Sequence, residues 1–208
     1  MNARLRTLLS NYPQLEPCHP DIREAFEVLR DSYAANGKLL LCGNGGSAAD
    51  ADHISGELLK GFQSKRPLSR IDQDTIGDDL APHLQQALPA IPLTAFNALA
   101  TAYTNDVNAE YIYAQLVLGL GAPGDVLLGI STSGNAKNVR HALRVARAKH
   151  IRTIGLTGET GGAMREFCDT CIRVPSTETF RIQEYHLPVY HALCLMLEDH
   201  FFCGEADA

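Results

Sequence analysis

The sequence predicts an α/β protein in which helices cover both faces of a parallel sheet. Short apolar runs suited to buried strands alternate along the chain with longer segments of helical period. Turns rich in glycine, serine or threonine follow several of these runs and stand directly before a helix. With 208 residues, of which 45% are hydrophobic and 20% charged, the chain has the size and composition of one domain with a full core.

The first 36 residues are expected to form a helical arm. Three leucines between positions 5 and 9 make one apolar face, and the prolines of residues 13–20 interrupt the helix. Apolar residues then return with helical period over 22–33, and Asn36-Gly37 is typical of a helix end. Such an arm is often an oligomer contact, but an ordinary core helix is equally compatible with the pattern.

The stretch that organises the chain is residues 38–57, KLLLCGNGGSAADADHISGE. Residues 39–42 read as a buried parallel strand. No bulky side chain stands between this strand and Ser47, so backbone N–H groups can approach an anion closely. Ser47 followed by Asp50 predicts a capping box, with a helix that starts at Ser47 and ends near Gly61. We therefore expect a phosphate at this helix start.

The remaining elements follow the same alternation. Residues 64–89 contain three prolines and four aspartates, which indicates a long surface excursion with one short helix at 80–88. A strand at 90–95 is confined by Pro92 to a sheet edge or a strand end. Further strands are expected at 126–130, 152–156 and 170–174, and further helices at 97–104, 109–120, 136–149 and 179–202, with a short one after 157–162.

A second loop, Ser131-Thr132-Ser133-Gly134-Asn135, follows a strand and precedes a helix. Its hydroxyls are equally compatible with plain helix capping. Two such loops at neighbouring strand ends nevertheless favour a monophosphate site, because parallel sheets bind ligands at that edge. Neither loop contains a P-loop lysine, and the G-x-G-x-x-A pattern at 43–48 lacks the strand and acidic residue that a dinucleotide site needs about 20 positions later.

Two helices carry candidate acid–base or metal-binding side chains. His53 and Glu57 are four residues apart, so they face the same way and can share a metal or a hydrogen bond, although such pairs are more often structural. On the final helix, Gln183 and His191 lie two turns apart and about 80° around the axis. The histidines of that helix (186, 191 and 200) are also compatible with core positions.

Charge and composition exclude several classes of protein. A net charge of −6 argues against direct nucleic-acid binding, and no apolar run approaches the roughly 20 residues of a membrane span. Without a recognisable signal peptide, a cytoplasmic location is expected. The six cysteines are too few for a disulfide scaffold. Cys168 and Cys171 form a C-x-x-C, but without a helix start or a second pair, buried reduced thiols are expected.

Taken together, five stretches resemble the sugar isomerase (SIS) domain family and, within it, the phosphoheptose isomerases. They are residues 42–57, Asn105-Asp106, 124–135, 156–162 and 181–191. The resemblance implies a single SIS domain over residues 1–208, a flavodoxin-like three-layer α-β-α sandwich with a five-stranded parallel sheet. It also implies a homotetramer with active sites between subunits. The implied reaction converts sedoheptulose 7-phosphate to D-glycero-D-manno-heptose 7-phosphate, the first step of bacterial heptose synthesis.

The resemblance also implies site residues. Glu57 and His191 match the proposed acid–base pair, and zinc, one ion per subunit, is expected at four positions: His53, Glu57, Gln183 and His191. Substrate contacts are expected from Asn44, Gly45, Gly46, Ser47, Glu57, Asn105, Asp106, Ser131, Thr132, Ser133 and Gln183.

Three departures from the family pattern stand out. Ala136 replaces a frequent serine after the phosphate loop. Lys60-Gly61 replaces a Gly-Arg, so a basic substrate contact is either missing or supplied by Lys60. Pro188 is expected to kink the final helix, free the carbonyl of Glu184 and re-aim His191.

Two other functions remain open. One is a non-catalytic SIS protein that binds the bacterial replication initiator as a tetrameric scaffold, and we expect such a protein to lack Glu57 and His191. The other is a SIS enzyme or sensor for an amino-sugar phosphate, which the opening motif with His53 and Glu57 makes less favourable.

Overall fold

The computed structural model describes residues 2–203 and has a parallel five-stranded sheet at its centre. The strand order is β2-β1-β3-β4-β5, and every neighbouring pair is parallel. This is the flavodoxin-like order, so the predicted fold class is confirmed. The strands are β1 (Leu39–Cys42), β2 (Ala90–Pro92), β3 (Val126–Ser131), β4 (Arg152–Gly158) and β5 (Thr170–Val174).

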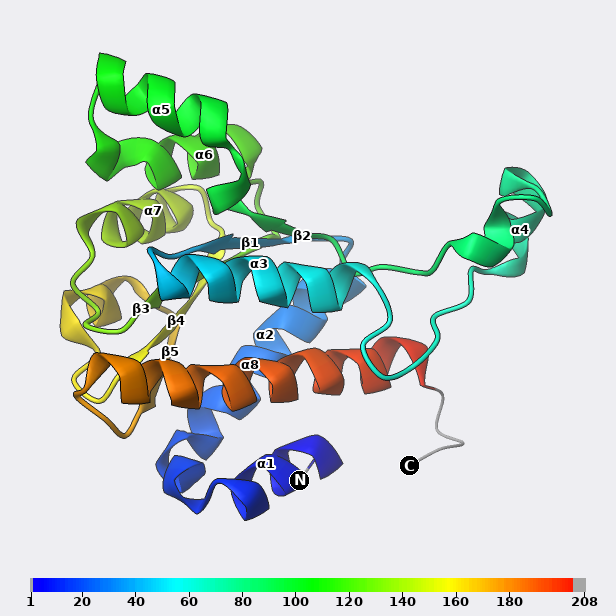
Figure 1. The fold of residues 1–208 in the computed structure, drawn as a ribbon, viewed down its shortest axis with the longest axis horizontal. Coiled ribbons are helices and arrows are strands. Elements are labelled where there is room, and N and C mark those ends of the chain that lie inside the picture. The colour runs from blue at the N-terminus through cyan, green and yellow to red at the C-terminus, as the bar shows by residue number, and fades with distance from the viewer. Residues whose placement is uncertain (1, 204–208) are drawn as a thin grey trace.

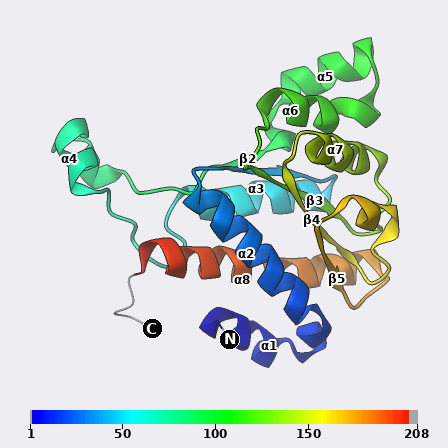
Figure 2. The same ribbon diagram turned by 180° about the vertical axis from the view of Figure 1, so that it is seen from behind.

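Alternation along β1 directs side chains into two separate cores. Leu39 and Leu41 join the core under α2, α3 and α8, whereas Leu40 and Cys42 join the core under α6 and α7. Three layers result, with α5 outside α6 (Figures 1 and 2). The long helices are α2 (His19–Ala34), α3 (Gly46–Leu59), α5 (Asn97–Asp106), α6 (Ile112–Leu120), α7 (Lys137–Ala148) and α8 (Thr179–Phe202).

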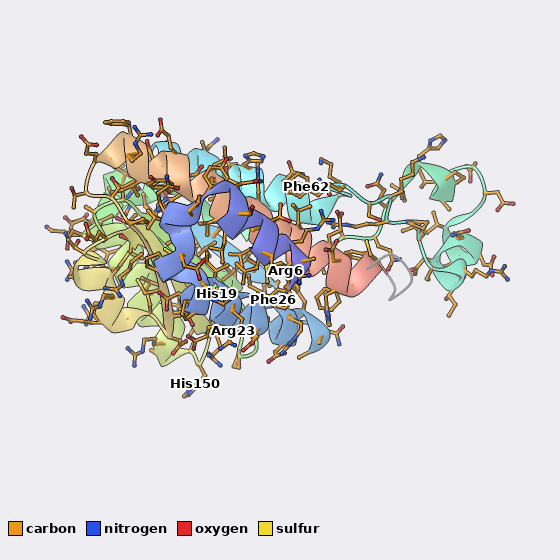
Figure 3. All side chains as sticks on the ribbon, turned by 90° about the horizontal axis from the view of Figure 1, so that it is seen from below. Arg6, His19, Arg23, Phe26, Phe62 and His150 are labelled. Atoms are coloured by element: carbon orange, nitrogen blue, oxygen red, sulfur yellow. The ribbon has the colours of Figure 1, made fainter. Side chains whose placement is uncertain are left out.

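The N-terminal arm is part of the core. Its elements are α1 (Ala3–Asn11), the short 3-10 helix η1 (Pro13–Cys18) and α2, interrupted as the prolines predicted. The leucines of α1 and the apolar face of α2 are buried against α8, and the ring of Phe26 meets that of His200 edge-on. Figure 3 shows Phe26 on this side of the molecule, together with Arg6, His19 and Arg23. Within one chain, the arm therefore packs as an ordinary part of the core, which was one of the two interpretations that the sequence allowed.

Most element boundaries agree with those predicted. β2 is an edge strand that ends at Pro92, and α8 has the bounds expected for the last helix. The helix expected at 109–120 is divided into a 3-10 turn, η4 (Ala109–Tyr111), and α6. Two further 3-10 turns are η3 (Leu93–Ala95) and η5 (Gly162–Phe167), the latter being the short helix expected after residue 162.

Residues 64–89 form the predicted excursion, but the helix placed at 80–88 is wrong. The helix is α4 (Arg70–Ile76), which projects away from the body of the molecule (Figure 1). Ser69 explains its position, because its hydroxyl accepts a hydrogen bond from the Asp72 amide at 3.1 Å and donates one to the Asp72 carboxylate at 2.6 Å. Only a short 3-10 turn, η2 (Ala81–His83), lies in the predicted range.

A buried ion pair fastens the root of this excursion to α8. Arg66 and Glu198 are both fully buried, and their Nε and Oε1 atoms are 2.9 Å apart. Arg66 also donates to the carbonyls of Glu57 and Leu58 at the end of α3, and its guanidinium lies 4.5 Å from the centre of the Phe202 ring. The pair therefore joins the C-terminal ends of α3 and α8.

Pro188, the residue expected to kink the final helix, lies inside that helix and does not interrupt it. α8 continues as one helix from Thr179 to Phe202, and it packs along α3 (Figure 1). His191, three residues after the proline, faces α3. Within residues 2–203, no helix combines the length and the apolar composition that crossing a bilayer requires.

Candidate active site

The site lies where the chain leaves β1 and β3 toward opposite faces of the sheet. β1 leads into α3 on one face and β3 leads into α7 on the other, which creates the crevice where open α/β sheets bind ligands. Asn44 and Asn138 bridge these two connections through two reciprocal amide hydrogen bonds of 2.9 and 2.8 Å. Sequence reasoning missed Asn138, although a polar amide in the first turn after a hydroxyl-rich loop was a usable signal.

The glycine-rich loop after β1 starts α3 one residue earlier than predicted. Gly45 occupies the cap position with φ 55°, no side chain caps the helix, and the helix begins at Gly46. The predicted capping box is therefore wrong. Ser47 lies inside the first turn, buried beneath Gly43, because the glycine takes the position that the serine was expected to hold. The loop is also held by Tyr113, whose hydroxyl donates to the Gly43 carbonyl at 2.5 Å.

The loop after β3 is held by hydrogen bonds from the end of β4 and the segment that follows it. The amides of Gly158 and Met164 donate to the carbonyls of Thr132 and Gly134 at 3.0 and 2.9 Å. Gly134 has φ 66°, and a Cβ at this position would overlap the Gly161 carbonyl. Along this loop, exposure rises from Ser131, which is buried, through Thr132, which is half-buried, to Ser133, which is exposed. The Ser133 hydroxyl is therefore the one that a ligand reaches most easily.

The facing sides of α3 and α8 bring together three of the predicted residues. His53 Nε2 lies 3.2 Å from Glu57 Oε1, and the His53 and His191 rings are 5.0 Å apart, edge to face. The other oxygen of Glu57 accepts a hydrogen bond from Lys60 at 3.0 Å. Phe62, just past the end of α3 (Figure 3), places its ring 5.3 Å from that of His191. Glu57 and His191 thus lie on adjacent helices, each beside the His53 ring.

His191 is poised as a neutral imidazole. Burial lowers its pKa below the usual value, and the nearby His53 adds to this effect while Glu57 opposes it. Its Nε2 atom is buried and has no hydrogen-bond partner within residues 2–203. A neutral imidazole with an uncommitted nitrogen can donate or accept a proton near neutral pH.

Gln183 lies nearer the start of α8 than His191 does. Its carboxamide packs directly on Gly46, at the glycine-rich loop. Because it is eight residues before His191, it lies about 12 Å away along the axis of α8. Within one chain, Gln183 is therefore placed for a contact at the loop and not beside His53, Glu57 and His191.

Asn105 and Asp106 lie apart from this helix pair. They form the end of α5, are exposed, and hydrogen-bond to each other at 2.8 Å. α5 packs on α6 and η4, across the sheet from α3 and α8. A single chain does not bring these two side chains to Glu57.

The donor atoms suit zinc, but one chain does not present an assembled site. His53, Glu57 and His191 offer the nitrogen and oxygen ligands that zinc prefers. However, both His53 nitrogens are engaged, Nδ1 with the Tyr190 hydroxyl at 3.0 Å and Nε2 with Glu57. Across the described part of the chain, no three His, Cys, Asp or Glu side chains are grouped to hold a metal ion. Cys168 and Cys171 are free, half-buried thiols.

Comparison with known proteins first defines the class. Residues 95–197 match the SIS domain family, and residues 6–72 match a second SIS domain family. The fold is also that of the phosphoheptose isomerase structures from Francisella tularensis and Neisseria gonorrhoeae. Their TM-scores are 0.74 and 0.70 at 33% and 34% identity, and each match covers 86% of both chains. The chain is thus a SIS-domain protein.

The sequence relatives then define the family. The phosphoheptose isomerase of Rhodospirillum rubrum is 42% identical over 199 residues, which cover 96% of each chain. Phosphoheptose isomerase 2 of Campylobacter jejuni is 43% identical over 178 residues, 86% of this chain and 79% of that one. This chain belongs to the phosphoheptose isomerase family. The alternative of a replication-initiator scaffold is not supported, and Glu57 and His191 are both present.

Proposed function

We propose that this chain is a phosphoheptose isomerase that converts sedoheptulose 7-phosphate to D-glycero-D-manno-heptose 7-phosphate, the first step of bacterial heptose synthesis. Its relatives carry that name, which supports the reaction type and the sugar phosphate class. The single observation that carries the assignment is that Glu57 on α3 and His191 on α8 both lie against the His53 ring, Glu57 at 3.2 Å from Nε2 and the His191 ring at 5.0 Å between centroids.

The reaction moves a proton between C1 and C2 through a cis-enediol. It needs a base near carbon and an acid near oxygen, and each such group contributes roughly 10²–10⁴-fold in rate. Glu57, fixed by His53 and Lys60, takes the carbon proton and returns it. His191, kept neutral by burial, serves O1 and O2.

The spacing of the site supports a long sugar. A phosphate held by the loops would sit near Gly46, with further contacts from Asn44, Gly45 and the hydroxyls of residues 131–133. Along α3, Gly46 is about 10 Å from His53, at the level of the Glu57 carboxylate. An open-chain heptose phosphate spans this distance from phosphate to C1, whereas a pentose phosphate falls short of it. Ser47 would contribute from the same loop, although its side chain is buried.

Three further expectations stay proposals. The first is a homotetramer with active sites between subunits. In such an assembly, Asn105 and Asp106 would reach the sugar bound in a neighbouring subunit. Light scattering measures the mass of the assembly. The second is one zinc per subunit, to be measured by elemental analysis of the purified protein; when bound, zinc polarises sugar oxygens and stabilises an enediolate. The third is location in the cytoplasm, which cell fractionation measures.

The deciding experiment incubates purified protein with sedoheptulose 7-phosphate in D₂O and follows the products by NMR. We expect aldoheptose phosphate, with deuterium at C2 in those turnovers in which the proton held by Glu57 exchanges with solvent before its return, and much slower turnover of ribulose 5-phosphate. Glu57→Gln should lower kcat by roughly 10²–10⁴-fold. Glu24→Gln, an exposed glutamate on α2, is the matched control and should leave kcat unchanged. Absence of turnover by folded wild-type protein, with and without added zinc, would overturn the assignment.

A further inference from the structure

The projecting segment, residues 67–85, stands away from the body of the molecule with apolar side chains on its surface. None of the residues of α4 is buried, and Ile71 is 78% exposed. Further along the segment, three more large apolar side chains are exposed: Ile76, Leu80 and Leu84. Four aspartates and one arginine leave the segment with a net charge of −3. It is therefore an acidic surface with an apolar part that nothing in the same chain covers.

The root of this segment is fixed, but its tip lacks support. The Gln86 amide donates to the Arg66 carbonyl at 2.8 Å, and the Gln86 side chain donates to the Pro67 carbonyl at 2.7 Å, so the two legs are tied together. Arg66 is in turn held by its buried pair with Glu198. At the tip, α4 has only seven residues, whereas an isolated helix is marginal even at about 12–15 residues. A second surface is therefore needed to hold α4.

A surface of opposite charge lies on α6 and α7. A groove of about 320 Å³ between these helices is lined by mostly apolar side chains and one cation: Tyr111, Ala114, His141, Arg144, Val145 and Ala148. Residues 137–149 contain five lysines and arginines and no acidic residue. Arg144 is exposed, and Lys149 donates to the Leu118 carbonyl at the end of α6 at 2.6 Å. Within residues 2–203, neither Arg144 nor Lys149 forms an ion pair.

We propose that the projecting segment of one copy docks on the α6–α7 groove of a second copy of this chain, with Ile71 in the groove and the aspartates facing Arg144 and Lys149. The two surfaces are complementary in charge, and each has an apolar part that the other can cover. They lie at opposite ends of the molecule (Figures 1 and 2), so one chain cannot fill its own groove. A second copy supplies both surfaces at once, because every copy carries the segment and the groove.

Photo-cross-linking tests the docking directly. The purified full chain carries the photoreactive amino acid benzoylphenylalanine in place of Ile71 and is illuminated without substrate. Linked species with twice the mass of one chain are isolated on a denaturing gel, and mass spectrometry identifies the joined peptides. We expect position 71 to be joined to residues 111–149 of the second copy. The same photoreactive group in place of Tyr12, an exposed side chain at the end of α1, should give no links to that range. Absence of a linked dimer, or links from position 71 to any other region, would overturn the proposal.

Charge reversal provides a second test of the same contact. Arg144→Glu places like charges opposite each other and should lower the yield of linked dimer by about tenfold or more. Adding Asp74→Lys and Asp78→Lys to that variant should restore the yield. Arg23→Glu, at an exposed arginine of α2 (Figure 3), is the matched control and should leave the yield unchanged.

Equal yields in Arg144→Glu and Arg23→Glu, or no recovery in the combined variant, would overturn the proposal. Neither test uses a substrate, so both are independent of whether the protein turns over sedoheptulose 7-phosphate. They are also separate from the expected tetramer. A tetramer measured by light scattering, in which position 71 is joined to some other region, would keep the assembly and overturn the docking of this segment on α6 and α7.

Discussion

Replacing Glu198 by Gln should destabilise the protein strongly, because four donors converge on this one buried carboxylate. Oε1 accepts from the Phe62 amide and Arg66 Nε at 2.8 and 2.9 Å, and Oε2 accepts from the Gln63 and Ser64 amides at 2.8 and 3.0 Å. Glutamine supplies one carbonyl oxygen, so its NH₂ group faces two donors wherever it points. The Arg66 cation also stays fully buried without a counter-charge.

The expected loss of stability follows from removing one partner of a buried ion pair. Such changes cost about 3–5 kcal/mol, mostly because a charge remains buried and uncompensated. For a chain of this length each kcal/mol shifts the melting temperature by roughly 2–4 °C, which gives an expected fall of roughly 6–20 °C. The neighbouring Asp199 provides a matched control. Its pair with Arg4, 2.8 and 2.9 Å, is 32% exposed on both sides, so Asp199→Asn should cost about 0–1 kcal/mol.

Urea unfolding followed by circular dichroism, at one fixed protein concentration, measures both variants. The pH dependence adds a second readout. Burial alone would raise the pKa of Glu198, but its amide and Arg66 donors outweigh burial and hold it below the usual 4.5. The stability gap between wild type and Glu198→Gln should therefore be complete at neutral pH and shrink as the pH falls below about 4.5. A gap under about 1 kcal/mol, or one no larger than that of Asp199→Asn, would refute the reasoning.

Three other predictions concern the core and the loops. Burial lowers the pKa of His186 from 6.5 to about 4, so the free energy of unfolding of the wild type should fall by about 3 kcal/mol as the pH drops from 6.5 to 4. The His186→Leu variant should not show this fall, and urea unfolding at a series of pH values measures both proteins. Gly134→Ala forces a Cβ onto the Gly161 carbonyl and should raise KM for the sugar phosphate by more than about tenfold, whereas Gly119→Ala, with open space around it, should not. Asn138→Ala removes both amide bonds across the crevice and should weaken substrate binding by about tenfold, read as KM.

Strands and long helices were predictable because their signals are local. The apolar runs at 39–42 and 126–130 are short and bounded by turn residues, which favours a buried strand over a helix, and the boundaries of α8 follow from its own sequence. The loops of the site were predictable for a related reason. A glycine-rich turn directly after a buried strand has few conformations open to it, and the sheet fixes the edge at which it emerges.

The errors arose where two local signals competed. Two Ser-x-x-Asp patterns occur in the sequence, at Ser47 in the glycine-rich loop and at Ser69 on the projecting excursion, and only the second is a helix cap. At Ser47 the preceding Gly45 adopts φ 55° and starts the helix first. At 80–88, helical composition is interrupted by Pro82, which leaves only a 3-10 turn. Spatial partners such as Asn138 and Tyr190 depend on packing between distant segments, which no local pattern contains.

One longer pattern does connect sequence to site. Three polar positions of α8 contact α3 or the residues that flank it: Gln183, Tyr190 with His191, and Glu198, at intervals of seven or eight residues, which is about two helical turns. Each meets the neighbouring segment in turn: the glycine-rich loop, the His53–Glu57 pair, and the residues just past the end of α3. The same two helices carry all three contacts, so a change at Glu198 that loosens the packing of α8 on α3 should also disturb the contact between His191 and the His53–Glu57 pair. Glu198→Gln should therefore lower kcat even at temperatures where the variant is fully folded, whereas Asp199→Asn should leave kcat unchanged. Full kcat in folded Glu198→Gln would show that the end contact stabilises the protein without setting the geometry of Glu57.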